Sequence, residues 1–297
     1  MRKVKILTDS CSDLNKALLE KYDIDYAKMN TVYEGVTLPA ELTWTPEEAH
    51  KLYNIMREGN RILTTQVPVE EFNRIFRKYV DLGFDIVYIG CSLKQSGSVN
   101  TGAVVAKEIM AENPEVKIFS IDSLNACLAE GMIAIEAAKF AAQGKDAQAV
   151  YNYVIKIRKT VHEYCTVHSL DSLRRAGRVK GAAAFFGNLM GVKPIIISDA
   201  VGNQAAFKKV KGRQNSLKEI VNLLKQDLIN PEEQTIYIGH ADCSKEEIDQ
   251  FVAMVKQEIP CKDVFVGFIG PIIGASIGPD AIVINGFGEE VTFSLGA

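Results

Sequence analysis

Short segments rich in serine and threonine follow several apolar runs of the sequence. They are TDSCSD (8–13), LTTQVP (63–68), IGCSLKQSGSVNTG (89–102) and IDSLNAC (121–127). Side-chain hydroxyls and backbone N–H groups hydrogen-bond small polar or anionic groups. Because no paired general acid and base accompanies them, we expect these segments to hold a ligand rather than to break bonds.

The segment 89–102 gives the clearest case. Ser96, Gly97 and Ser98 stand directly before an expected helix. Free N–H groups and the helix dipole favour an anion at such a position. The carboxyl ends of strands in an open α/β sheet also form the usual ligand crevice, so the hydroxyl-bearing segments are expected to converge there.

Helix capping is the competing interpretation of the first two segments, since serine, threonine and aspartate are preferred at helix N-termini. For the segment 8–13 we favour capping by Asp9, Ser10 or Ser12. For Thr64 and Thr65 we leave capping and ligand binding open.

Three further segments attract attention through basic residues or glycine. LRRAGRVKG (173–181) contains Arg174, Arg175 and Arg178, and KKVKGR (208–213) is also basic. On a chain with a net charge of −3, such clusters indicate a docking surface, a phosphate contact or simply a solvated face. The segment 267–286, with Ser276 at its centre, is glycine-dense; it would either approach a ligand closely or form a string of turns.

Several classes of function lack their motifs. The sequence contains no GxGxxG, GxxxxGK[ST] or GxSxG pattern, and its four histidines and six cysteines show no metal-ligand spacing. We therefore expect no cofactor and no metal, and we expect the cysteines to be structural thiols. The net charge offers no basic field for nucleic acid. No apolar run is long enough for a transmembrane segment and no signal peptide is evident, so we expect a cytoplasmic protein.

The first half of the chain alternates between expected strands and helices. Strands are expected at 4–9, 84–90 and 115–122, and helices at 14–22, 45–59, 67–83, 99–112, 126–144 and 146–161. Alternation of this kind predicts βαβ units and a mostly parallel sheet with helices on both faces. A capping box is expected from Thr45 to Glu48.

The second half has more strand character. Strands are expected at 163–169, 193–198, 234–241, 263–269 and 281–288, with helices at 182–190, 216–229 and 244–259. Capping boxes are expected from Ser216 to Glu219 and from Ser244 to Glu247. We therefore predict an N-terminal three-layer α/β domain (1–161) and a C-terminal α+β domain with a mixed sheet (162–297), packed together with the ligand between them.

Six of these segments, in this order, resemble the DegV family. KILTDSCSDL, LTTQVPVEEF, CSLKQSGSVNTGA, IDSLNACLAEG, LRRAGRV with GNLMGVKPII, and GPIIGASIGP are each similar to a family signature, and together they span nearly the whole chain. The resemblance implies two α/β-type domains that bind one long-chain fatty acid in an apolar tunnel. Better understood members of the family carry the fatty acid for a bacterial fatty acid kinase, whose separate ATP-using subunit makes acyl phosphate for phospholipid synthesis.

Carried over to this sequence, the resemblance implies that Thr64 and Ser96 hold the fatty-acid carboxylate, assisted by the Gly97 N–H group. It implies that Arg178, with Arg174 and Arg175, lies where the kinase subunit docks. The chain itself would be a carrier, not an enzyme.

The sequence departs from the family pattern at the expected carboxylate site. Ser276 stands near the head group where the family typically has a histidine, Asp280 stands where it has a glycine, and the loop before Ser96 is one residue longer. Two alternatives remain: a lipid sensor of the same family without a kinase role, and a stand-alone enzyme acting on a small phosphorylated or hydroxylated substrate.

Overall fold

A four-stranded parallel sheet forms the core of the first half. The computed structural model describes residues 2–168, 170–181 and 191–295. The sheet has the order β2-β1-β6-β7, and its strands are β1 (Lys3–Asp9), β2 (Asp25–Ala27), β6 (Phe84–Gly90) and β7 (Ile118–Asp122). Residues 86–89 of β6 are apolar and buried without a break because both faces of the sheet are covered.

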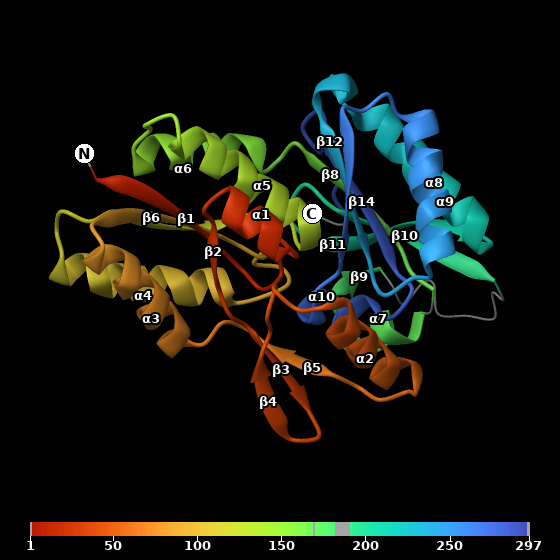
Figure 1. The fold of residues 1–297 in the computed structure, drawn as a ribbon, viewed down its shortest axis with the longest axis horizontal. Coiled ribbons are helices and arrows are strands. Elements are labelled where there is room, and N and C mark those ends of the chain that lie inside the picture. Colours follow the sequence, from red (N-terminus) through yellow and green to blue (C-terminus); the bar gives the residue numbers. More distant parts are fainter. Residues whose placement is uncertain (1, 169, 182–190, 296–297) are drawn as a thin grey trace.

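Helices cover the two faces of this sheet. On one face lie α3 (Val69–Asp81) and α4 (Ser98–Glu112), and on the other lie α5 (Cys127–Ala141) and α6 (Ala147–Ile157) (Figure 1). A short helix, α1 (Lys16–Lys21), follows β1. Successive strand residues alternate between the two faces: Val87 packs in the same cluster as α5, whereas Ile86 packs with Phe72 of α3.

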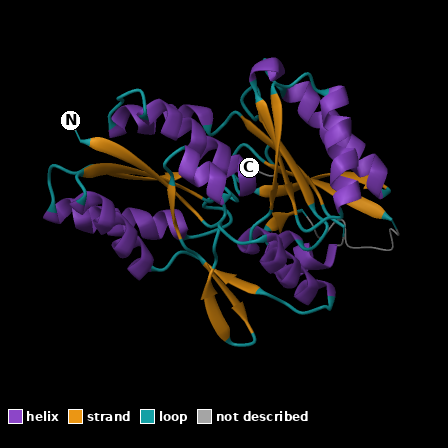
Figure 2. Cartoon of the chain, viewed as in Figure 1, coloured by secondary structure: helices purple, strands orange, loops and turns teal. Residues whose placement is uncertain are grey.

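A seven-stranded mixed sheet forms the core of the second half. Its order is β13-β12-β14-β8-β10-β11-β9. The strands are β8 (Val161–Thr166), β9 (Val179–Lys180), β10 (Val192–Ser198), β11 (Gln204–Lys211), β12 (Thr235–His240), β13 (Asp263–Phe268) and β14 (Ile282–Phe287). Two long helices, α8 (Arg213–Asp227) and α9 (Lys245–Glu258), pack on one face (Figure 2). A short helix, η2 (Pro231–Glu233), precedes β12.

Helix α5 joins the two halves. It contacts β1 and β6 of the parallel sheet and β8, β12 and β14 of the mixed sheet. Most of its residues, from Cys127 to Ile135 without a break, are buried. Its sequence is rich in alanine and largely apolar because most of the helix lies inside the protein core, although Lys139 in its last turn is exposed.

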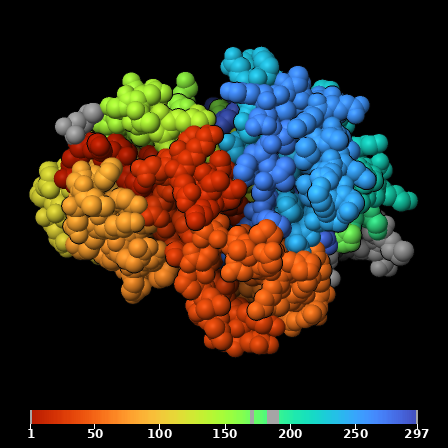
Figure 3. Space-filling view, in the orientation of Figure 1, coloured from red at the N-terminus to blue at the C-terminus, as the bar shows by residue number. Residues whose placement is uncertain are grey.

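A third, three-stranded sheet was not predicted. Its strands β3 (Asn30–Tyr33), β4 (Val36–Pro39) and β5 (Leu63–Thr65) pair antiparallel in the order β4-β3-β5. Helix α2 (Pro46–Arg57) lies between β4 and β5 in the chain. In Figure 3 this region, in red-orange and orange, lies at the bottom of the molecule, below the first half on the left and the second half on the right.

Hydrogen bonds tie the two halves together. The Tyr53 hydroxyl donates to the carbonyl of Ile269 at 2.6 Å, and the Gly270 N–H donates to the Asp13 carboxylate at 2.8 Å. Arg57 donates to Asp242 and, at 2.7 Å, to Asp280. The expectation of two packed halves agrees with these contacts.

The predicted helix starts had mixed outcomes. The capping box from Thr45 to Glu48 is confirmed, with both reciprocal hydrogen bonds present. Ser244 caps α9 by accepting the Glu247 N–H, while the Glu247 carboxylate pairs with Arg213 instead of completing the box. The prediction for Ser216 was wrong: α8 begins at Arg213, and the Ser216 hydroxyl donates to the Arg213 carbonyl within the first turn.

The capping interpretation of the segment 8–13 was also wrong. Asn15 caps α1, whereas the Asp9 carboxylate is buried and accepts hydrogen bonds from the Tyr88 hydroxyl and from the Cys11 and Cys91 N–H groups. Ser10 links Met29 to the Ala40 carbonyl. This segment therefore holds the strand ends of the parallel sheet together.

The remaining differences concern the second half. The glycine-dense segment contains a helix, α10 (Pro271–Ile277), and a second helix, α7 (Leu170–Ala176), carries Arg174 and Arg175. The basic segment 208–213 lies largely in β11. The helix expected at 182–190 lies outside the described residues. The predicted fold class, a parallel-sheet α/β half followed by a half with a mixed sheet, is confirmed; the boundary after residue 161 stays a prediction.

Candidate functional site

A cavity of about 210 Å³ lies where the two halves meet. Its walls come from β5 and the loop after it, the loop before α4, helix α10, and strands β8, β10 and β14. All four residues expected at a carboxylate site line it: Thr64, Ser96, Gly97 and Ser276. Residues far apart in sequence therefore meet here, as the convergence of strand ends predicted.

The hydroxyl groups of the loop before α4 are fixed by local hydrogen bonds. Ser96 Oγ lies 2.9 Å from Ser98 Oγ and accepts the Ser98 N–H at 3.3 Å. Ser98 Oγ in turn accepts the Val67 N–H at 3.1 Å, which links this loop to the segment after β5. Gly97 is the N-terminal boundary residue of α4, and no side chain caps this helix start. The free N–H groups there are therefore available to a ligand.

Gly97 allows close packing against the Gln66 side chain. A Cβ atom at this position would lie 2.2 Å from the Gln66 side-chain oxygen. Gln66 is held there by its own hydrogen bond to Thr101 Oγ1 at 2.8 Å. Thr64 and Thr65 belong to β5, and α3 begins at Val69 with Pro68 as its boundary residue, so neither threonine caps a helix.

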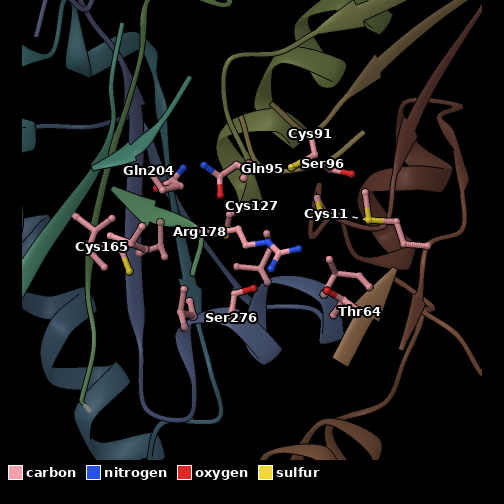
Figure 4. Close-up of a pocket in the computed structure, with 18 of the residues that line it drawn as sticks. Cys11, Thr64, Cys91, Gln95, Ser96, Cys127, Cys165, Arg178, Gln204 and Ser276 are labelled. Atoms are coloured by element: carbon pink, nitrogen blue, oxygen red, sulfur yellow. Dashed lines mark hydrogen bonds between the residues drawn. The ribbon is translucent and has the colours of Figure 1, made fainter. Parts of the chain in front are cut away.

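Figure 4 shows how the labelled side chains are distributed around the cavity. Thr64 and Ser96 lie on one side, Cys165 and Gln204 on the opposite side, and Arg178 and Ser276 between them. Arg178 is solvent-exposed and also lines the cavity, with one guanidinium N–H donating to the Ala176 carbonyl at 2.7 Å.

The other basic residues lie elsewhere. Arg175 lines a smaller hollow beside the cavity and donates to the Gly59 carbonyl at 3.2 Å. Arg174 is exposed on the same helix. In the second basic segment, Lys208 pairs with Glu219 and Arg213 pairs with Glu247. Lys208 and Arg213, for which the sequence allowed a phosphate contact, therefore form ion pairs within the protein.

The floor of the cavity is the inner face of the seven-stranded sheet. Ile196, Cys165 and Val283 are paired neighbours on β10, β8 and β14, and all three line the cavity. Ile272, Ile273 and Ile277 of α10 contribute further apolar surface. The cavity therefore combines hydroxyl-bearing loops with an apolar floor, an arrangement suited to an amphiphilic ligand.

Four of the six cysteines line this cavity: Cys11, Cys91, Cys127 and Cys165. All six are free thiols. A hydrogen bond with Cys91, together with burial, raises the pKa of the Cys11 thiol well above its usual range. The sulfurs of Cys11 and Cys91 and a Glu130 carboxylate oxygen lie within 4.8 Å of one another. Burial also raises the pKa of Glu130.

Two cavity residues were missed by the sequence interpretation. Glu163 is 4% exposed and lines the cavity, and Gln204 donates to its carboxylate at 2.9 Å. Burial raises the pKa of Glu163 to about 7. The available signal was an acidic residue, Glu163, directly before the mostly apolar residues YCTV of an expected strand.

Asp280, one of the departures noted in the sequence, has a structural explanation. It adopts a left-handed backbone conformation, with φ of 62°, and accepts a hydrogen bond from Arg57 of α2. It therefore joins the end of the α10 segment to the opposite half.

Among the described helices, none has the length and apolar character needed to cross a bilayer.

Comparison with known proteins identifies close relatives. The sequence model described as "Uncharacterised protein, DegV family" matches residues 3–286. A DegV domain-containing protein of Clostridium perfringens is 33% identical over 294 residues, covering 97% of this chain and 99% of that protein.

Two solved structures from Thermotoga maritima have the same architecture. One, described as a DegV lipid-binding protein, is 26% identical with a TM-score of 0.83 and covers 98% of this chain and 100% of its own. The other, described as revealing a fatty acid binding function, is 25% identical with a TM-score of 0.82 and covers 96% and 99%.

Proposed function

This chain belongs to the DegV family, and we propose that it binds one long-chain fatty acid in the cavity between its two halves. The carboxylate would lie against Thr64, Ser96 and the Gly97 N–H group, with Ser276 nearby. The acyl chain would lie over Ile196 and the other apolar floor residues. The observation that carries this proposal is the meeting of hydroxyl-bearing loops and an apolar floor in one cavity; the binding properties of the two Thermotoga relatives support it.

The energetics are consistent with such a ligand. Burial of about 15 methylene groups at roughly 0.8 kcal/mol each gives a gross gain near 12 kcal/mol. Association and ordering of the chain oppose much of this gain. Two or three hydrogen bonds to the head group then orient the ligand and add a modest amount. A submicromolar dissociation constant is the expected result.

Extraction of bound lipid tests this proposal. We expect mass spectrometry of the denatured recombinant protein to show a C14–C18 fatty acid. The Cys165→Phe variant, which places a ring on the cavity floor, should lose it, and the Cys261→Phe variant provides the matched control because Cys261 lies outside the cavity. The proposal fails if the wild-type protein contains no fatty acid and binds none when it is added.

We further propose that the chain acts as a carrier that presents the fatty acid to a separate, cytoplasmic, ATP-using kinase subunit. Arg178 supports this proposal because it is exposed and lines the cavity together with Thr64, Ser96 and Ser276. A partner that approached the head group would meet this side chain. Arg178→Ala should therefore reduce acyl phosphate formation with a cognate kinase and leave fatty acid affinity within about threefold. Loss of fatty acid binding alone would instead assign Arg178 to the ligand.

Ser276 favours one alternative, a lipid sensor without a kinase role. Phosphoryl transfer requires stricter positioning of the carboxylate than binding does, and serine stands here where the family typically has a histidine. Ser276→His should raise acyl phosphate formation if that residue limits the reaction. Equal activity before and after the substitution would show that this position does not separate the two functions.

A further inference from the structure

A row of polar side chains crosses the seven-stranded sheet next to the apolar floor of the cavity. Gln204 of β11 pairs with Ser198 of β10, and Glu163 of β8 pairs with Asn285 of β14. A hydrogen bond from Ser198 Oγ to Glu163 Oε1, at 3.1 Å, joins the two pairs. The neighbouring row on the same face is apolar, and Cys165 is its central residue. On this face of the sheet, a row of polar side chains therefore stands directly beside a row of apolar ones.

The carboxylate of Glu163 is only half satisfied. Its Oε1 atom accepts hydrogen bonds from Ser198 and, at 2.9 Å, from Gln204. Its Oε2 atom is buried and has no hydrogen-bond partner within the described part of the chain. A buried polar atom without a partner destabilises the structure, because it has lost its hydrogen bonds to water. Glu163 lines the cavity, and a bound molecule could supply the missing partner once the side chains that cover Oε2 shift.

We propose that the ligand of this cavity is an acyl chain that carries a hydroxyl group, which hydrogen-bonds Glu163 Oε2. This inference rests on the proposed fatty acid binding and adds the class of fatty acid. An unsubstituted chain would leave the buried oxygen without a partner, whereas a hydroxyl group would satisfy it.

A hydroxyl group suits this site better than a carbonyl group. When Glu163 is ionised, Oε2 only accepts hydrogen bonds, and when it is protonated, Oε2 donates one, since Oε1 already accepts two. A hydroxyl group donates in the first case and accepts in the second. A carbonyl group can only accept, and it would fail with the ionised form.

The site also limits where the hydroxyl group lies along the acyl chain. Gln204 and Cys165, the neighbours of Glu163, lie on the side of the cavity opposite Thr64 and Ser96 (Figure 4). If the carboxylate lies at Thr64 and Ser96, the hydroxyl group must be well separated from it. A hydroxyl group on the carbon next to the carboxylate would lie at the wrong side of the cavity.

Competition between matched C16 acids tests this inference. Delipidated protein is titrated with palmitic acid, with 2-hydroxyhexadecanoic acid and with isomers hydroxylated farther along the chain. We expect one of the latter to bind about tenfold more tightly than palmitic acid, the size of one buried hydrogen bond to a carboxyl group. The 2-hydroxy acid should show no such gain.

Variants of Glu163 locate the effect. Glu163→Leu should abolish the tenfold preference, measured as the ratio of the two dissociation constants in that variant. Glu163→Gln keeps the acceptor for Ser198 and Gln204 and should retain the preference. It takes the place of the leucine variant in this test if the leucine variant does not fold. Glu108→Leu is the matched control, since Glu108 is exposed on α4 outside the cavity.

The outcomes separate this inference from the proposed function. Tight binding of palmitic acid with no gain from any distal hydroxyl group would overturn the inference and leave fatty acid binding intact. A preference that survives Glu163→Leu would also overturn it. Binding of none of these acids would reject the proposed function itself.

Discussion

Replacing Glu163 by glutamine should change how the stability of the protein depends on pH. Burial raises the pKa of Glu163 from an ordinary 4.5 to about 7, against the lowering effect of its hydrogen bonds with Gln204 and Ser198. Between these two pH values the folded protein keeps a proton that the unfolded chain releases. The free energy of unfolding must therefore fall as pH rises through this window.

The magnitude follows from the two pKa values. Each pH unit of difference corresponds to about 1.4 kcal/mol, so a difference of about 2.5 corresponds to a destabilisation of about 3 kcal/mol above pH 7. About 2 kcal/mol of this effect develops between pH 5 and pH 8. Glutamine does not titrate and keeps the hydrogen bonds to Oε1. Glu163→Gln should therefore gain about 2 kcal/mol relative to the wild type over that interval.

Urea unfolding at pH 5 and pH 8, followed by circular dichroism, measures this difference. The comparison with the wild type is necessary because burial also raises the pKa of Asp13 to about 7, which makes both proteins lose stability over the same window. Glu108→Gln, at an exposed site, should show no difference from the wild type. A gap between Glu163→Gln and the wild type that is equal at both pH values, or that narrows toward pH 8, would refute the assignment of a buried, proton-holding carboxyl group.

Four other substitutions test the site and the fold. Thr64→Ala and Ser96→Ala should each weaken fatty acid binding by about 1 kcal/mol or more in calorimetric titrations, because a buried carboxylate loses a charge-assisted hydrogen bond; unchanged affinity in both variants would reject the head-group assignment. Thr45→Ala should lower the free energy of unfolding by about 1 kcal/mol, since it removes the side-chain cap of α2, and a neutral result in urea unfolding would contradict this role. Gly274→Ala should cost about 1–3 kcal/mol in the same assay, because a Cβ atom there would lie 2.3 Å from the Tyr53 hydroxyl, which hydrogen-bonds the Ile269 carbonyl; a stabilised variant would show that Tyr53 can move without cost.

The regular elements of the fold could be predicted because their sequences carry local signals. The strand at 84–90 is a continuous apolar run, and the helix at 45–59 begins with a complete capping box that the structure confirms. The three-stranded sheet escaped prediction because β3 to β5 are only three or four residues long and partly exposed. The α10 segment escaped because its glycines favour turns, whereas in the folded protein Gly274 allows the helix to pack closely against Tyr53.

The candidate site was predictable only in part for a related reason. The hydroxyl-bearing loops could be placed at strand ends, and Thr64, Ser96, Gly97 and Ser276 do lie around one cavity. Glu163 could not be placed from the sequence, because alternation along β8 shows that it shares a face with Cys165 but not what that face packs against. The place of Arg178 in the cavity lining likewise depends on how the two halves pack together.

The central claim, that the cavity between the two halves binds one fatty acid, is tested most directly by calorimetric titration of the delipidated protein with palmitic acid. We expect saturable binding of one acid per chain with a submicromolar dissociation constant, lost in Cys165→Phe and retained in Cys261→Phe. Absence of saturable binding by the wild type, or equal binding by both variants, would contradict it.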